Sequence, residues 1–340
     1  MARTMLTLLL FTRFSLATAG YPDHSPNFQG TFGHSPSPFR IRVDKEFIEA
    51  TKQRVALTRT PIGIPELEAQ EGPPVHNATA VRDYWVNEYD WFEEQESINN
   101  QYAVPSGTNI RGLRLFRFLQ FTTTVDISAH SGYKESVPLH FVHHRSPRED
   151  AIPLLFIHGW PGSFIEIGPT ICSLTHPPNS SFPAFHVVAP SIPGFAFSPA
   201  PTKPGYGYIE AAHTFNELML QLGYGRYVIQ GGDAGGIIMR YQASLYPSSV
   251  VSGLNNFWVT SSSERDLERY RSGETSEDET VVIELLESFV TQHFGYGQIQ
   301  QTRPLRLAYA LTDSPVGWRC GSTMPSTTAS GTPPSIALGN

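Results

Sequence analysis

Cysteine is nearly absent from this chain of 340 residues, which contains only Cys172 and Cys320. Two thiols can form at most one bridge, so a disulfide framework and a four-cysteine zinc site are both excluded. The stability of the fold must therefore come from an apolar core. The length is sufficient for one large domain or two smaller ones.

Positive charge is also scarce. Lysine and arginine number 24 against 31 aspartate and glutamate residues, and the formal net charge is -7. Nucleic acids are bound through basic surfaces, so we predict no nucleic-acid partner. Glycine and proline, at 28 residues each, favour a globular protein with many turns.

The sequence has no apolar run long enough to form a transmembrane segment. Its mostly apolar stretch near the start is short and is followed by Arg13 and by Ala17-Thr18-Ala19, which has the form of a signal-peptidase site. We therefore predict a signal peptide over residues 1–19 and a secreted protein, with an organelle or cytoplasmic location as the alternatives. Residues 20–37, rich in Pro, Gly and Ser, are predicted to be a linker.

Two helices are expected before any sheet, within a region that we assign to residues 38–150. Asp44 is positioned to cap the first helix. Thr79 is positioned to cap the second, whose apolar residues recur at four-residue spacing over 81–92. From about Leu113 the pattern changes to short strands.

Strand and helix then alternate over residues 151–256, which is typical of a doubly wound α/β sheet. The run Pro153–Ile157 is apolar on both faces, as in a central parallel strand. A charged, Ser-rich segment and an amphipathic helix follow, and they indicate a partial helical lid over 257–318. The predicted elements of the sheet region are strands at 153–157, 186–189, 227–230 and 250–254 and helices at 165–172, 209–222 and 237–245.

The segment most informative about chemistry is a glycine-rich turn between a strand and a helix. Gly231 and Gly235 flank Asp233 in the spacing of a nucleophile elbow, in which a tight turn projects the central side chain above the sheet. The alternative is that Asp233 only caps the following helix. The spacing fits neither a dinucleotide fingerprint nor a phosphate-binding loop.

A second motif follows the central strand and reads His158-Gly159-Trp160-Pro161-Gly162. In an α/β-hydrolase sheet this position supplies an oxyanion donor, so the backbone N–H groups of Trp160 and Ala234 are expected to converge beside Asp233. We assign His158 a structural role. The alternative is an ordinary Pro-Gly turn.

Taken together, these motifs resemble the microsomal-type epoxide hydrolases, which are α/β-hydrolases with an N-terminal meander and a helical lid. The resemblance extends from about Pro38 to Trp318. It rests on Trp85, Tyr89-Asp90-Trp91, residues 151–164, Pro190-Ser-Ile-Pro-Gly-Phe-Ala-Phe-Ser198, the Gly-Gly-Asp turn, Gly295-Tyr296 and residues 310–317.

The resemblance implies that Asp233 opens an epoxide of a small apolar substrate, forming an ester, while Tyr296 protonates the ring oxygen. The chemistry suits a carboxylate, since it is ionised near neutral pH and needs no base to attack a saturated carbon. No cofactor or metal is implied. The alternatives are a haloalkane dehalogenase-type reaction through the same aspartate and, for Tyr296, a packing role.

The chain departs from the family pattern in several places. The only histidine after Asp233 is His293, in the lid, and residues 319–340 form a Ser/Thr/Pro/Gly-rich tail unlike the family. We therefore predict that the C-terminal strands, the acid and the water-activating histidine are missing. Sustained turnover is then not expected, and a catalytically inactive relative that binds apolar ligands is the alternative.

The sequence has three further features. Residues 103–120 are interpreted as an insertion, with read-through of an intron as the alternative, and Ala234 stands where the family usually has tryptophan. His140, His143 and His144 lie on or just after a strand, but without an evident carboxylate partner they do not indicate a metal site.

Overall fold

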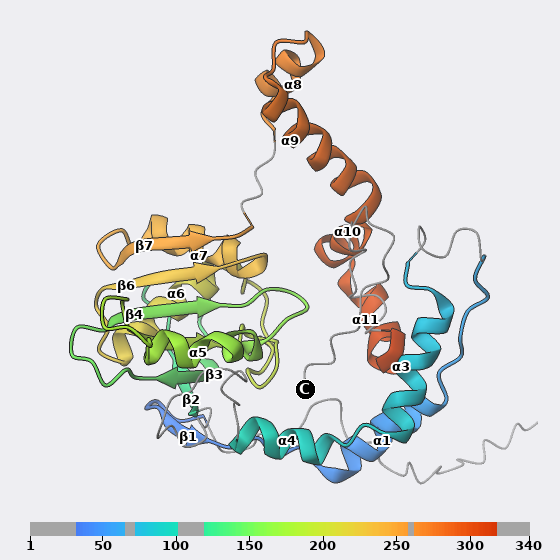
Figure 1. Cartoon of the computed structure of the whole chain (residues 1–340), viewed down its shortest axis with the longest axis horizontal. Helices are drawn as coiled ribbons and strands as arrows, with labels where there is room; N and C mark the ends of the chain where they lie inside the picture. Colours follow the sequence, from blue (N-terminus) through green and yellow to red (C-terminus); the bar gives the residue numbers. More distant parts are fainter. Residues whose placement is uncertain (1–31, 65–71, 101–118, 258–261, 318–340) are drawn as a thin grey trace, which may run out of the picture.

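The computed structural model describes residues 32–64, 72–100, 119–257 and 262–317 (Figure 1). The predicted signal peptide, most of the predicted linker, residues 103–118 of the interpreted insertion, Cys320 and the 319–340 tail lie outside these residues. Secretion therefore stays a prediction. Gln120, the last residue of the interpreted insertion, is the first residue of a strand.

One mixed sheet of seven strands organises the described residues, in the order β1-β2-β3-β5-β4-β6-β7. β1, β2, β3 and β5 pair in antiparallel fashion, whereas β5, β4, β6 and β7 are parallel. The predicted α/β-hydrolase sheet is thus confirmed, and the strands of the 38–150 region belong to this same sheet. The strands are Ser37–Phe39 (β1), Gln120–Val125 (β2), Val137–His144 (β3), Ile152–Ile157 (β4), Phe185–Pro190 (β5), Tyr227–Gly231 (β6) and Val250–Asn255 (β7).

β4 has the central position that its continuous apolar run predicts. It pairs with β5 on one side and β6 on the other, so that Leu154 lies opposite both Val187 and Val228. The chain passes from β4 to β5 on one side, and after β5 it crosses through α6 (Tyr208–Gln221) to β6 on the other side of β4. In parallel sheets such a switch point opens a crevice at the carboxyl ends of the strands, and ligands bind there.

Alternate residues of the strands pack against helices on opposite faces of the sheet. Leu155 and Ile229 join a core cluster with α6 (Tyr208–Gln221) and α7 (Ala234–Leu245). Leu154 and Val187 join a second cluster with Phe164 and Ile171, from a 3-10 turn (η1, Phe164–Ile167) and α5 (Gly168–Thr175). In Figure 1 α5 lies in front of the sheet, and α6 and α7 lie behind it.

Helix boundaries in this region differ modestly from those predicted. The helix expected at 165–172 is divided into η1 and α5, with Pro169 in the first turn of α5. Proline lacks an N–H but fits the first turn of a helix, where that donor has no intrahelical partner. α7 begins at Ala234, three residues before the predicted start at Ile237.

The second N-terminal helix was predicted incorrectly. Thr79 lies inside α3 (Val75–Asn87), where its hydroxyl donates to the Val75 carbonyl, and a separate helix α4 (Trp91–Asn100) follows. The break occurs because Asp90 Oδ1 accepts hydrogen bonds from Phe92 N at 2.7 Å and Glu93 N at 3.3 Å, which starts a new helix.

The first N-terminal helix, α1 (Lys45–Ala56), is confirmed, but the expectation that no strand precedes it is wrong, because β1 comes before it and pairs with β2. Asp44 occupies its N-cap position but makes no side-chain capping hydrogen bond. α4 holds the segment before α1 against the sheet, since Asn99 Oδ1 accepts from Ile41 N at 2.9 Å and Asn99 Nδ2 donates to Ile41 O at 2.9 Å.

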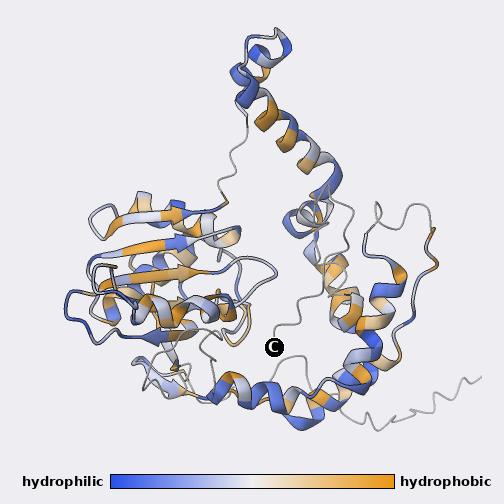
Figure 2. Ribbon diagram, viewed as in Figure 1, coloured by the Kyte–Doolittle hydropathy of each residue, from blue (hydrophilic) through white to orange (hydrophobic). Residues whose placement is uncertain are grey.

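The lid forms an arm that leaves the sheet after β7 and returns beside α1 and α3 (Figure 1). Arg54 Nη1 of α1 donates to Thr312 O at 3.4 Å. Both apolar and polar residues occur along α9 (Figure 2), and one of the apolar side chains, Leu285, is 65% exposed. None of the described helices is both long enough and apolar enough to cross a membrane. The lid elements are Glu264–Arg271 (α8), Glu277–Ser288 (α9), a π-helical turn Phe289–His293 (η2), Gly295–Thr302 (α10) and Pro304–Asp313 (α11).

Several buried or half-buried histidines lie on or near the sheet. Burial lowers the pKa of His140 to about 3 and the pKa values of His143, His144 and His158 to about 4. The His140 ring is fully enclosed, with Nδ1 2.9 Å from a serine hydroxyl and Nε2 3.0 Å from a glutamine carbonyl. These rings are therefore neutral in the folded protein at neutral pH.

Lowering the pH from about 7 to about 4 is expected to reduce the free energy of unfolding, partly through His140. An unfolded histidine binds a proton near pH ~6.5, whereas folded His140 stays neutral until about pH 3, so acid favours the unfolded state. Urea unfolding across this range checks the prediction. The pH dependence should be weaker in His140→Gln and unchanged in the exposed-site control His293→Gln, and equal slopes in the three proteins would contradict it.

Candidate active site

Asp233 lies in a strained turn between β6 and α7. Its φ of 50° and ψ of -124° fall in a region that L-residues rarely adopt. A Cβ on Gly231 would lie 2.5 Å from Gly235 O, and a Cβ on Gly235 would lie 2.6 Å from His158 O. Only glycine at both positions permits this turn, and the turn projects the Asp233 side chain beyond the carboxyl edge of the sheet.

The helix-cap alternative for Asp233 does not fit its contacts. The residue occupies the N-cap position of α7, yet its side chain makes no capping hydrogen bond. Instead, Asp233 Oδ1 accepts from the backbone N–H of Trp160 at 2.7 Å. The carboxylate is therefore directed toward the loop after β4.

That loop packs directly on the turn. A Cβ on Gly159 would lie 2.6 Å from Asp233 Cβ, so glycine is required for the approach. The Trp160–Pro161 peptide bond is cis. The second predicted donor, the N–H of Ala234, belongs to the first residue of α7, where a helix has no internal acceptor. The Trp160 N–H therefore contacts the Asp233 carboxylate, and the role of the Ala234 N–H as a second oxyanion donor stays a prediction.

His158 connects two loops beneath the site. Its Nδ1 is 3.0 Å from Gly159 O, and its Nε2 accepts from Ile192 N at 3.1 Å. These contacts require the tautomer with the proton on Nδ1, and the ring is buried. Both nitrogens are occupied, so His158 is not available to take a proton from water.

A cavity of about 500 Å³ opens above Asp233 at the switch point of the sheet. Apolar and backbone groups form much of its wall, while Asp233 and Glu166 are its only charged side chains among the residues that the structure describes. The buried Gln230 Oε1 has no hydrogen-bond partner. The cavity is lined by Ile157, Gly159, Trp160, Pro161, Gly162, Glu166, Gln230, Gly232, Asp233, Asn256 and Phe257.

Tyr296 of α10 brings the lid to this site. Its ring stacks on the Trp160 indole at a centroid separation of 4.9 Å and an interplanar angle of 15°. Burial, followed by the negative charge of Asp233, raises the pKa of the Tyr296 phenol. The phenol therefore keeps its proton at neutral pH and can donate it near Asp233.

Sequence reasoning missed two titratable residues near Asp233. Burial and the Asp233 charge raise the pKa of Tyr208, at the start of α6. Burial is also the main effect raising the pKa of Glu166, with a smaller contribution from Asp233. Both follow loops that leave the carboxyl ends of parallel strands, and that position was the signal available in the sequence.

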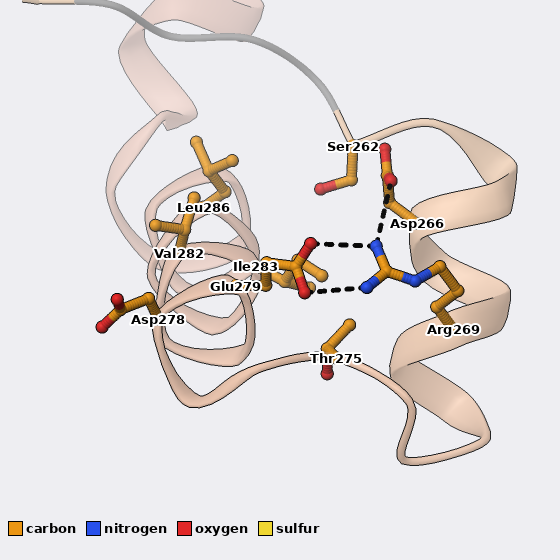
Figure 3. A pocket seen from close by; sticks show the side chains of 9 residues that line it. All are labelled: Ser262, Asp266, Arg269, Thr275, Asp278, Glu279, Val282, Ile283 and Leu286. Carbon is orange, nitrogen blue, oxygen red and sulfur yellow. Dashed lines mark hydrogen bonds and ion pairs between the residues drawn. The ribbon is translucent and has the colours of Figure 1, made fainter.

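A second cavity, of about 320 Å³, lies between α8 and α9 of the lid (Figure 3). Arg269 donates to Glu279 at 2.9 and 2.8 Å and lies 4.0 Å from Asp266 (Figure 3). This arrangement fastens the two helices together. Asp278 also lines the cavity, so its charge is negative on balance, but the cavity lies away from the switch point of the sheet, and the Asp233 cavity is the better candidate for catalysis.

No cluster of three or more His, Cys, Asp or Glu side chains suited to a metal ion occurs within the described ranges. The histidines considered in the sequence have other contacts. His143 Nε2 is 3.0 Å from Tyr224 Oη, and His144 Nε2 accepts from Leu119 N at 2.9 Å.

Comparison with known proteins agrees with this geometry. The family model described as epoxide hydrolase N terminus matches residues 36–167, and the model for the alpha/beta hydrolase fold matches residues 152–254. Epoxide hydrolase 1 of Sus scrofa is 32% identical over 298 residues, which cover 82% of this chain and 60% of that relative. The chain likewise spans 57% and 61% of two further curated relatives.

Two solved structures share the fold over most of the chain. Juvenile hormone epoxide hydrolase from Bombyx mori superposes with a TM-score of 0.69 at 27% identity, covering 86% of this chain and 65% of that one. The Aspergillus niger epoxide hydrolase gives a TM-score of 0.67 at 26% identity, covering 87% and 71%. By its N-terminal region, its sheet and these relatives, the chain belongs to the epoxide hydrolase family of the α/β-hydrolase fold.

Proposed function

We propose that this chain opens the ring of small apolar epoxides with the Asp233 carboxylate. The observation that carries the proposal is the strained turn, which presents Asp233 to the cavity while Trp160 N–H binds its Oδ1. The other carboxylate oxygen, Oδ2, would attack an epoxide carbon. The C–O bond of the ring breaks, its electron pair goes to oxygen, and a glycol ester of Asp233 forms.

Tyr296 suits the role of proton donor in this step. The developing alkoxide takes the phenolic proton, and the tyrosinate would later recover a proton from solvent. Stacking on Trp160 fixes the ring beside the loop that holds Asp233. The apolar walls from Ile157, Trp160 and Phe257 favour an apolar substrate.

Ester hydrolysis would place negative charge on the former carbonyl oxygen. The N–H groups of Trp160 and Ala234 are positioned to stabilise it, and one such donor is typically worth about 2.7–4 kcal/mol. The same step needs an activated water, and no histidine lines the cavity within the described residues. The proposal is therefore tested through ester formation, which does not depend on turnover.

Incubation with styrene oxide is expected to give one covalent adduct, located on Asp233 by peptide mass spectrometry. A parallel incubation with 1-chlorohexane distinguishes the haloalkane alternative. Labelling by the epoxide alone supports the proposal, and labelling by the chloroalkane alone favours the dehalogenase-type reaction. An adduct elsewhere, or no adduct, would refute the assignment of Asp233.

A further inference from the structure

Glu166 is held at the wall of the Asp233 cavity by its surroundings. It belongs to η1, whose residues Phe164 and Ile167 are fully buried and fix the turn against the sheet. The carboxylate lies over Gly162, where an added Cβ would overlap Glu166 Oε1 and lie 2.7 Å from Cδ. Glu166 therefore approaches the catalytic loop because residue 162 has no side chain.

The charge lining the cavity is of one sign. Glu166 and Asp233 both contribute carboxylates, and among the described lining residues there is no lysine, arginine or histidine. A substrate with a negative group would meet repulsion from two charges, one of which is the nucleophile itself. The proposed ring opening uses Asp233 and Tyr296 and gives Glu166 no step, which leaves its charge to act on the substrate as a whole.

We propose that Glu166 determines specificity by excluding anionic epoxides, so that the site accepts neutral and cationic apolar epoxides. This inference rests on the proposed function of Asp233. At a separation of about 12 Å and an effective dielectric constant near 20, one uncompensated charge corresponds to a rate or affinity difference on the order of tenfold, and a shorter separation gives a larger difference.

The electrostatic link between the two carboxylates supports the inference. Burial is the largest effect raising the pKa of Glu166, a hydrogen bond from the Ser163 backbone opposes it, and the negative charge of Asp233 adds to the increase. The Glu166 and Asp233 carboxylates therefore interact electrostatically across the cavity. Because the pKa of Glu166 is raised, the measurements are made at about pH 8, where the ionised form of a carboxyl group is favoured more than at neutral pH.

The experiment compares three styrene oxides that differ only in the para substituent: hydrogen, carboxylate and trimethylammonium. The initial rate of Asp233 ester formation is measured by mass spectrometry for each. In Glu166→Gln the ratio of the anionic to the neutral rate should rise about tenfold, and the ratio of the cationic to the neutral rate should fall. Glu166→Asp, which retains the charge, should keep the wild-type values of both rate ratios, anionic to neutral and cationic to neutral.

Glu149→Gln is the matched control, since it removes the same charge at an exposed position before β4, at the opposite end of that strand from the cavity. It should leave both ratios unchanged. The rate with the neutral probe shows whether each variant is folded. The corresponding diols, which cannot alkylate the protein, are titrated calorimetrically against the same proteins as a measure of binding alone.

Unchanged ratios in Glu166→Gln, with the neutral probe still labelling Asp233, would overturn the inference and leave the proposed function intact. An equal shift in Glu149→Gln would also overturn it, because the effect would then come from net charge. If no epoxide labels Asp233, the proposed function fails, and the diol affinities alone decide whether Glu166 selects by charge.

Discussion

Replacing Asp233 with glycine is expected to abolish ester formation and to give a protein more stable than the matching alanine variant. Both substitutions remove the carboxylate and its hydrogen bond from Trp160 N–H. They differ in the backbone, because the φ of 50° and ψ of -124° strain any residue with a Cβ but not glycine.

Strain of this kind costs about 1–3 kcal/mol, and the greater freedom of glycine in the unfolded chain returns about 0.5–1 kcal/mol. We therefore expect Asp233→Gly to exceed Asp233→Ala by about 1 kcal/mol in free energy of unfolding. Urea denaturation measures this difference, and the styrene oxide assay should detect no adduct at residue 233 in either variant. An alanine variant more stable than the glycine variant, by the about 0.5–1 kcal/mol that the unfolded-chain entropy alone predicts, would show that the turn stores no strain.

The elements that sequence reasoning predicted correctly depend on local patterns. β4 is recognisable because a strand buried on both faces needs an unbroken apolar run, as in residues 153–157. The turn at Asp233 is recognisable because its two glycines lie within two residues of it. The meeting of Trp160 with Asp233 then follows, since adjacent parallel strands end at the same edge of the sheet.

The errors and omissions arise where a tertiary or capping contact competes with periodicity. The four-residue spacing of apolar side chains continues past Asp90. The structure nevertheless ends α3 before this residue, and the Asp90 carboxylate caps the start of α4. Glu166 is an ordinary polar position of a short helical turn by sequence. Its place in the cavity depends on Gly162, four residues before it in the chain, and on the distant β6–α7 turn. Neither contact leaves a periodic signal.

Gly235→Ala is expected to lower the free energy of unfolding by about 3 kcal/mol, more than any other substitution proposed above. The reason is that the new Cβ would meet backbone atoms, which cannot move aside as a flexible side chain can. It would overlap Ile157 O and lie 2.6 Å from His158 O, both at the carboxyl end of the central strand. To relieve the overlap, α7 must move away from β4. That movement separates Asp233 from Trp160 N–H, so labelling by styrene oxide should fall together with stability.

Gly225→Ala is the matched control for this substitution. Gly225 is exposed, and an added Cβ there has no neighbouring atom within 4 Å. The control should unfold in urea close to the wild-type midpoint and retain wild-type labelling of Asp233. If Gly235→Ala unfolded at the same midpoint as Gly225→Ala, the close approach of α7 to the end of β4 could not be what fixes the turn. The geometry proposed for the nucleophile would then lose its main structural support.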